Sequence, residues 1–232
     1  ISACLVGSEM CKETGVHTGS TPTQDPFTGT AVPASFSSIP CNTYSFGGPT
    51  PYGQITGPVS LSPGRYCGGI NVKAGTVTLT AGTYYMDLAF VGAGLLVNAG
   101  GSLTDNGNGV TIVLTSSGSF SNLANLDLGG LLSGGVINLT APSSGPFANL
   151  VVFADPPPPA LLSVQLFAEA QNSFVGTIYA PSSQVVYLLG SGTKTGQCTR
   201  LIADTIIFGL TGASFSKCAV TSASASPAQL LE

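Results

Sequence analysis

The chain has 232 residues, of which 43% are apolar and only 7% are charged, and its formal net charge is −4. This apolar content excludes a disordered chain, and the six scattered Lys and Arg residues exclude a basic patch for nucleic acid. The longest apolar runs fall far short of the roughly 18 residues that a membrane-spanning helix needs. Because charge is so scarce, the surface must consist largely of Ser, Thr, Asn and Gly.

Residues 1–55 are rich in turn-forming residues and carry no periodic apolar pattern, as the stretch 18–26 illustrates. We expect them to form an irregular N-terminal extension held by disulfide bonds. The chain begins at Ile1 without Met or a basic leader, so we expect a processed mature form of a secreted protein.

Six cysteines are present, an even number that indicates an oxidising, extracellular compartment in a chain of this composition: Cys4, Cys11, Cys41, Cys67, Cys198 and Cys218. None belongs to a Cys-x-x-Cys motif and His17 is the only histidine, so we expect no metal site and no cofactor. Many pairings are open. We expect the cysteines to pair in chain order, first with second, third with fourth and fifth with sixth.

Residues 56–218 consist of short β-type runs separated by Gly, Asn, Ser or Pro. In residues 76–80 the alternation is strict, with Val77 and Leu79 on one face and threonines on the other, as in a half-buried strand. Only residues 161–171 offer the pattern of a short helix. We therefore predict an all-β domain over residues 56–218.

A right-handed parallel β-helix, or solenoid, is favoured for this domain over the alternative of a β-sandwich. Single Gly and Asn residues at the breaks tolerate the left-handed backbone of tight corners. Residues 62–66 (SPGRY) return 18 positions later as residues 80–84 (TAGTY), and a period of about 20 residues is typical of stacked repeats. The hairpin signal Asn-Gly is confined to the stretch that includes 106–107, which is too rare for a meander.

Residues 219–232 are rich in small residues and are expected to form an extended C-terminal tail. We expect this tail to dock on the exposed solenoid edge of a neighbouring copy, through Ala228, Gln229, Leu230 and Leu231.

Several blocks of sequence carry a family pattern, in order: Asp25–Gly29, Cys41, Leu61–Ile70, Thr80–Met86, Gly109–Thr115, Leu139–Pro146, Gly176–Ser182 and Cys198–Ile206. Together they resemble the secreted β-helical region of proteins from tight-adherence (Tad) pilus loci, the TadG-like family. The resemblance implies an extracytoplasmic bacterial protein connected with surface appendages or adhesion, and it brings no catalytic residues. The chain departs from the family in lacking its N-terminal membrane helix and in the insertions at 156–159 and 161–171.

Catalysis is not expected, because the acidic residues of the solenoid fall singly and lack the paired arrangement of a polysaccharide-cleaving enzyme: Asp87, Asp105, Asp127, Asp155 and Asp204. With its only histidine outside the solenoid, the domain has no Ser-His-Asp triad.

Two surface patterns suggest binding. The aromatic residues of the domain could form a sugar-stacking platform or could pack into the core, and we favour packing into the core. They are Tyr66, Tyr84, Tyr85, Tyr179, Tyr187, Phe90, Phe153, Phe174 and Phe208. The threonines of residues 76–80 resemble those of a flat ice-binding face, which needs the same pattern on successive turns.

From these observations we predict an extracellular structural protein, not an enzyme, that assembles with copies of itself. The product is expected to be a bacterial surface filament or a pilus-associated appendage. The alternatives are an adhesin that binds surface glycans and, after it, a polysaccharide-active enzyme.

Overall fold

The computed structural model describes residues 25–44, 54–87, 94–117, 126–127, 135–154, 163–167, 173–188 and 198–208. The chain divides into two compact units. One unit comprises residues 1–30 and 219–232; its described part, residues 25–30, is a turn in which the Thr28 N–H donates to the Asp25 carbonyl (3.2 Å). The other unit comprises residues 31–218 and holds all of the strands. The expected tail contacts, and the expected pairing of Cys4 with Cys11, lie outside the described residues.

The described residues form mostly parallel β-strands and contain a single short 3-10 helix, Ala34–Ser38, which is consistent with the prediction of an all-β domain. The segment 161–171, which offered the one helical pattern, contains a strand instead, because its apolar residues join a parallel ladder. The strands are β1 (Gln54–Thr56), β2 (Val59–Leu61), β3 (Gly64–Cys67), β4 (Gly69–Leu79), β5 (Gly82–Asp87), β6 (Gly94–Val97), β7 (Gly101–Thr104), β8 (Val110–Thr115), β9 (Leu126–Asp127), β10 (Val136–Thr140), β11 (Leu150–Ala154), β12 (Ser163–Phe167), β13 (Ser173–Leu188) and β14 (Thr199–Phe208).

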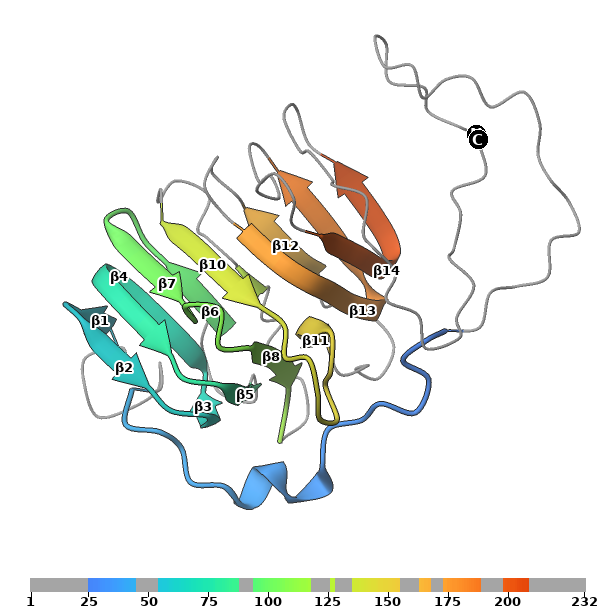
Figure 1. The fold of residues 1–232 in the computed structure, drawn as a ribbon, viewed down its shortest axis with the longest axis horizontal. Coiled ribbons are helices and arrows are strands. Elements are labelled where there is room, and N and C mark those ends of the chain that lie inside the picture. The colour runs from blue at the N-terminus through green and yellow to red at the C-terminus, as the bar shows by residue number, and fades with distance from the viewer. Residues whose placement is uncertain are drawn as a thin grey trace, which may run out of the picture. The chain divides into compact units, whose positions relative to one another are not determined.

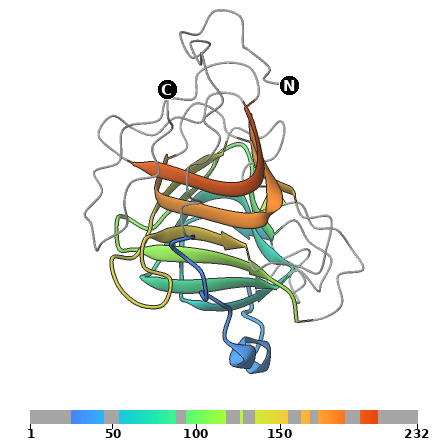
Figure 2. The same ribbon diagram turned by 90° about the vertical axis from the view of Figure 1, so that its right-hand side faces the viewer.

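All of the described strand pairs are parallel, and the chain visits three ladders in a repeating order (Figure 1). Sheet B holds β1, the first half of β4, and β6. Sheet C holds β2, the second half of β4, β7, β10 and the start of β13. Sheet A holds β3, β5, β8, β11, the middle of β13 and the start of β14. A further ladder joins β9, β12 and the ends of β13 and β14. The result is a solenoid-like stack, which Figure 2 shows layer upon layer.

The first turn has nearly the period that the sequence indicates, and later turns are longer. Paired residues are separated by 18 positions between Val59 and Val77 and by 20 between Gly64 and Tyr84. In sheet A the separation then rises to 28 from Tyr84 to Ile112, and to 40 from Ile112 to Val152. The extra residues lie in the connections between strands, so the ladders themselves stay in step.

The two similar segments, SPGRY at 62–66 and TAGTY at 80–84, both end in Tyr because each Tyr has the same structural role. The Tyr66 hydroxyl donates to the Ser62 carbonyl (2.7 Å), and the Tyr84 hydroxyl donates to the Thr80 carbonyl (2.8 Å), so each ring closes its own corner. The two rings are stacked, with centroids 5.8 Å apart. Burial raises the pKa of both hydroxyls, and for Tyr66 the neighbouring Tyr84 raises it further.

Aliphatic side chains from all three sheets fill the interior. Each buried one contributes roughly 1.5–3 kcal/mol relative to exposure, which lets a chain with few charges remain folded. The central members, all of them fully buried, are Val72, Val77, Leu79, Leu95, Val97, Leu103, Ile112, Ile137, Val152 and Ile178.

The outer surface of sheet A is covered as well. Phe36 of the 3-10 helix packs against Tyr85 (centroids 5.8 Å apart), and Phe147 packs against Phe153 (5.3 Å), which stacks on Tyr179 (5.6 Å). These aromatic residues therefore pack within the fold and form no open platform. Phe90 lies outside the described residues, as do the side chains of Tyr187 and Phe208.

Candidate functional site

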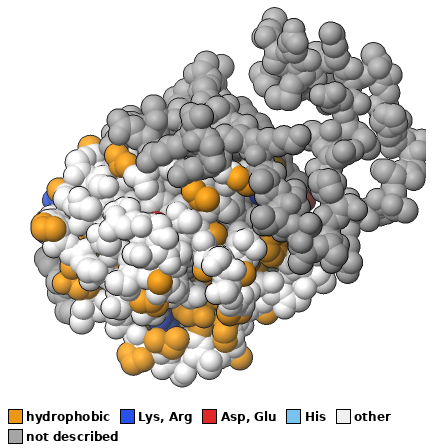
Figure 3. All heavy atoms as spheres, viewed as in Figure 1, with side chains coloured by type: hydrophobic (Ala, Val, Ile, Leu, Met, Phe, Trp, Pro, Cys, Tyr) orange, Lys and Arg blue, Asp and Glu red, His pale blue; other side chains and the backbone are white. Residues whose placement is uncertain are grey.

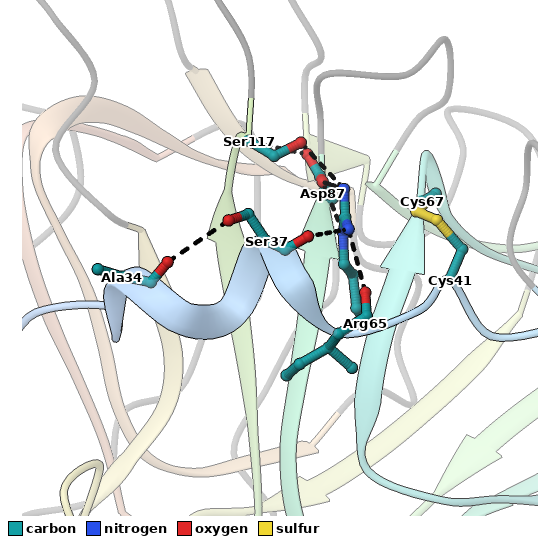
Figure 4. A network of polar contacts seen from close by, with 8 residues as sticks. Ala34, Ser37, Cys41, Arg65, Cys67, Asp87 and Ser117 are labelled. Atoms are coloured by element: carbon teal, nitrogen blue, oxygen red, sulfur yellow. Dashed lines mark hydrogen bonds and ion pairs between the residues drawn. A yellow bond between two sulfur atoms is a disulfide. The ribbon is translucent and has the colours of Figure 1, made fainter.

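The most elaborate polar network joins Arg65 of β3 to Asp87 of β5 (Figure 4). Arg65 Nη2 lies 2.7 Å from Asp87 Oδ2, and Arg65 Nε donates to the same oxygen (2.9 Å). The Asp87 side chain is fully buried, whereas that of Arg65 is 11% exposed. The second carboxylate oxygen, Oδ1, accepts the Ser117 N–H (2.9 Å). A charged pair removed from water in this way stays favourable only when its remaining polar atoms are satisfied, as they are here.

The same guanidinium fastens the N-terminal segment to the stack. Arg65 Nη1 donates to the carbonyls of Ser37 and Ile39 (3.0 Å for Ile39). Beyond Ile39 the segment runs along the free edge of β3, where the Asn42 N–H donates to the Arg65 carbonyl (2.7 Å). This network is therefore an anchor for residues 31–42, which we call the strap.

A disulfide between Cys41 and Cys67 closes the strap, with the two Cα atoms 5.5 Å apart. This is the expected pairing of the third cysteine with the fourth. Cys198 is also disulfide-bonded, and its expected partner, Cys218, lies outside the described residues.

Sequence reasoning missed the link between Arg65 and Asp87, because the two residues are 22 positions apart and meet only through the register of the ladder. A signal was nevertheless present, since Arg65 occurs inside the SPGRY echo, where its counterpart in the next turn is the uncharged Thr83.

A second buried carboxylate, that of Asp105, shapes the connection between β7 and β8. Its Oδ1 accepts the Gly107 N–H (3.1 Å), and its Oδ2 accepts the N–H groups of Gly109 (3.1 Å) and Thr140 (3.2 Å). Asp87 and Asp105 thus face separate sets of structural donors. Of the other acidic residues considered in the sequence, Asp204 is exposed on β14, Asp127 ends β9, and Asp155 lies outside the described residues.

The described residues contain no group of three or more His, Cys, Asp or Glu side chains placed to hold a metal ion. Within the same residues, the structure has no helix that is long and apolar enough to cross a membrane.

The outer surface of sheet C, which we call the hydroxyl face, carries a regular array of polar side chains. On β4, Thr76 and Thr78 alternate with the buried Val77 and Leu79. Ladder register places Ser102 beside Thr76 and Thr104 beside Thr78. On the far side of β7, β10 places Val136 beside Ser102 and Asn138 beside Thr104. On the other side of β4, β2 places Ser60 beside Thr78. The pattern that the sequence showed on β4 therefore recurs on β7, while β2 adds the single hydroxyl of Ser60 and β10 replaces the two hydroxyl residues with Val136 and Asn138.

The end of the stack at β14 exposes two large apolar side chains, next to the exposed Asp204 and Thr205. Ile206 and Ile207 are 37% and 42% exposed, and Leu201, Ile202 and Ala203 of the same strand are half-buried. Within the described part of the chain, β14 pairs with β13 on one side only. At the opposite end, core residues of the first turn are covered, with Ile55 and Leu61 only 3% and 2% exposed.

Comparison of the chain with family models, with curated proteins and with solved structures finds no match.

Proposed function

We propose that the chain is an extracellular structural protein of a bacterial surface, built as a right-handed β-solenoid, that assembles with copies of itself into a filament or a pilus-associated appendage. The right hand follows from the strong preference of parallel strand connections for right-handed crossovers. The disulfides agree with an oxidising compartment, and the resemblance to the TadG-like family supports a role in a surface appendage.

The observation that carries self-association is the end of the stack at β14, to which no further strand pairs within the described residues. An edge strand presents unpaired N–H and C=O groups and readily accepts another strand, and β14 adds Ile206 and Ile207, which are 37% and 42% exposed. Solenoids that remain monomeric in solution usually close their ends with polar capping turns. Burial of this end against another copy would pair the edge of β14 and would cover Ile206 and Ile207.

The two ends of the stack differ, so we expect a head-to-tail contact. The end of β14 belongs to the ladder that also holds β9 and β12, and β9 lies next to β6 of sheet B. Sheet B begins at β1, whose outer residues Gln54 and Thr56 are exposed. Pairing of β14 with β1 of the next copy would continue this side of the solenoid, and a contact between unlike surfaces generates rings or open filaments.

Light scattering after gel filtration, with negative-stain microscopy of the same samples, tests this function. The wild-type protein is expected to form concentration-dependent oligomers or fibres. The double variant Ile206→Lys/Ile207→Lys is expected to remain monomeric, because two ammonium groups cannot be buried at the contact.

Asn108→Lys is the control, since it adds a charge at an exposed site in the connection between β7 and β8, away from both β1 and β14. It should assemble as the wild type does. A wild-type protein that stays monomeric at high concentration, and binds glycans in that state, would instead support the adhesin alternative.

A further inference from the structure

The hydroxyl face is a two-dimensional array. Parallel strands lie about 4.8 Å apart, and alternate residues of one strand recur after roughly 6.6 Å. Thr76 and Thr78 on β4, with Ser102 and Thr104 on β7, therefore place four hydroxyl groups at the corners of a near-rectangular mesh. Ser60 extends one column of the mesh toward β2, and Asn138 extends it toward β10.

The face is rigid, because its inward neighbours are locked in the core. Val77, Leu79, Leu103 and Ile137 are all fully buried, and Leu139 is 1% exposed. Figure 1 shows β4, β7 and β10 side by side and nearly parallel. The spacing of the outer side chains is thus fixed by the backbone.

The chemistry of the face is uniform. The parts of the described strands that pair in sheet C contain no charged residue, and few Lys, Arg, Asp or Glu side chains are visible on the side of the molecule that Figure 3 shows. Threonine methyl groups and Val136 place apolar patches between the hydroxyls. The face also lacks the aromatic rings that line most ligand and sugar sites.

Several polar groups on this face are available to an outside partner. The hydroxyls of Thr76, Thr78 and Ser102 form no hydrogen bond within the described part of the chain, whereas Thr104 Oγ1 accepts the Asn106 N–H (3.1 Å).

We propose that the hydroxyl face is an ice-binding surface, whose partner is crystalline water. A rigid, uncharged mesh of hydroxyl and methyl groups holds bound water molecules at a fixed repeat, and water ordered in this way is able to join a growing crystal plane. Soluble ligands prefer concave sites with a few converging polar groups, whereas the hydroxyl groups of this face lie in parallel rows on one sheet. Crystalline polysaccharide also offers regular rows of hydroxyl groups, but the absence of aromatic rings from this face argues against it.

The test measures thermal hysteresis and inhibition of ice recrystallisation by the whole purified chain. The wild-type protein should shape ice crystals and slow their growth. The double variant Thr78→Lys/Thr104→Lys should lose both activities, since bulky cations disrupt the ordered water. Thr78→Val/Thr104→Val, which retains the methyl groups and removes the hydroxyls, should lose part of the activity.

Thr43→Lys is the matched control, because it makes the same chemical change at an exposed threonine outside all of the sheets. It should keep full activity, and circular dichroism should confirm that every variant is folded. A wild-type protein without effect on ice growth overturns the proposal, as does equal activity in the Thr78→Lys/Thr104→Lys variant. Binding of the wild type to crystalline chitin or cellulose, lost in that variant, would assign the face to polysaccharide instead.

This inference does not depend on the proposed assembly, since the hydroxyl face and the end of β14 are separate surfaces. Ile206→Lys/Ile207→Lys should abolish self-association and leave the monomer active on ice. The two proposals therefore fail independently.

Discussion

Arg65 and Asp87 form the one ion pair within the described residues, in a chain with 16 Lys, Arg, Asp and Glu residues in total. Both carboxylate oxygens are satisfied, and the guanidinium reaches two carbonyls of the strap. Removing one partner of such a pair leaves the other charge buried and unpaired, which is far more costly than losing a surface pair.

Asp87→Asn is therefore expected to lower the free energy of unfolding by about 3–5 kcal/mol, measured by denaturant unfolding followed by circular dichroism. The double variant Arg65→Met/Asp87→Leu, which removes both charges, should recover part of that loss. A loss below about 1 kcal/mol in Asp87→Asn, as for a surface pair, would contradict the role assigned to the pair.

The buried pair Tyr66 and Tyr84 makes stability depend on pH. Burial raises the pKa of both hydroxyls above the value of about 10 found in an unfolded chain. The folded state thus retains protons that the unfolded state releases. The resulting stability is complete below about pH 10 and is lost as the pH rises toward the folded-state pKa.

We expect the free energy of unfolding to fall above about pH 10, together with the appearance of tyrosinate absorbance. In Tyr66→Phe/Tyr84→Phe this fall should be much shallower, although the variant starts less stable because it lacks the two corner hydrogen bonds. An equally steep fall in the variant would show that other groups cause the alkaline loss.

Among the elements, the corner between β3 and β4 is the tightest. Gly69 has a φ of +95°, and a Cβ atom placed there would lie 1.7 Å from the Gly94 carbonyl oxygen of the neighbouring turn. Gly57, between β1 and β2, has nearly the same φ of +96°, but a Cβ atom there would meet nothing within 4 Å. An alanine at Gly57 would therefore suffer backbone strain alone, whereas an alanine at Gly69 would suffer the same strain and a steric clash as well.

Gly57→Ala is expected to cost about 1–3 kcal/mol, the usual price of a non-glycine residue in a sparsely populated backbone region. Gly69→Ala should cost considerably more, or should prevent folding, because the backbone of β6 must also move. Thermal unfolding and soluble yield measure both effects. Equal destabilisation by the two variants would contradict the close approach of the turns.

The strands were the most predictable elements. Alternation in residues 76–80 gave the correct inward and outward faces of β4, since Val77 and Leu79 are buried and Thr76 is exposed. The helix pattern of residues 161–171 was a wrong indication, since the segment contains the strand β12. A short apolar run without strict alternation fits a helix or a buried strand equally well. The membership of these residues in a ladder is decided by neighbours on other turns.

For the molecule as a whole, the sequence indicates stacking but not which residues meet across turns. The SPGRY echo located the Tyr66 and Tyr84 pair, because both rings perform the same local task. The Arg65 and Asp87 pair and the repeated columns of the hydroxyl face depend on the register between turns of unequal length. Without an exact period, a single sequence does not specify that register.

The unequal turns differ at more than one corner. After sheet A the connection lengthens from Gly68 alone behind β3 to residues 88–93 behind β5 and 116–125 behind β8, and between sheets C and A it lengthens from residues 80–81 to 105–109 and 141–149. Length therefore enters the connections while the ladders stay in step, and longer connections cost little extra free energy. The protein can thus be regarded as a natural display scaffold: a foreign peptide spliced into the exposed residues 143–146, between β10 and β11, would leave the register of the ladders and the β14 end unchanged.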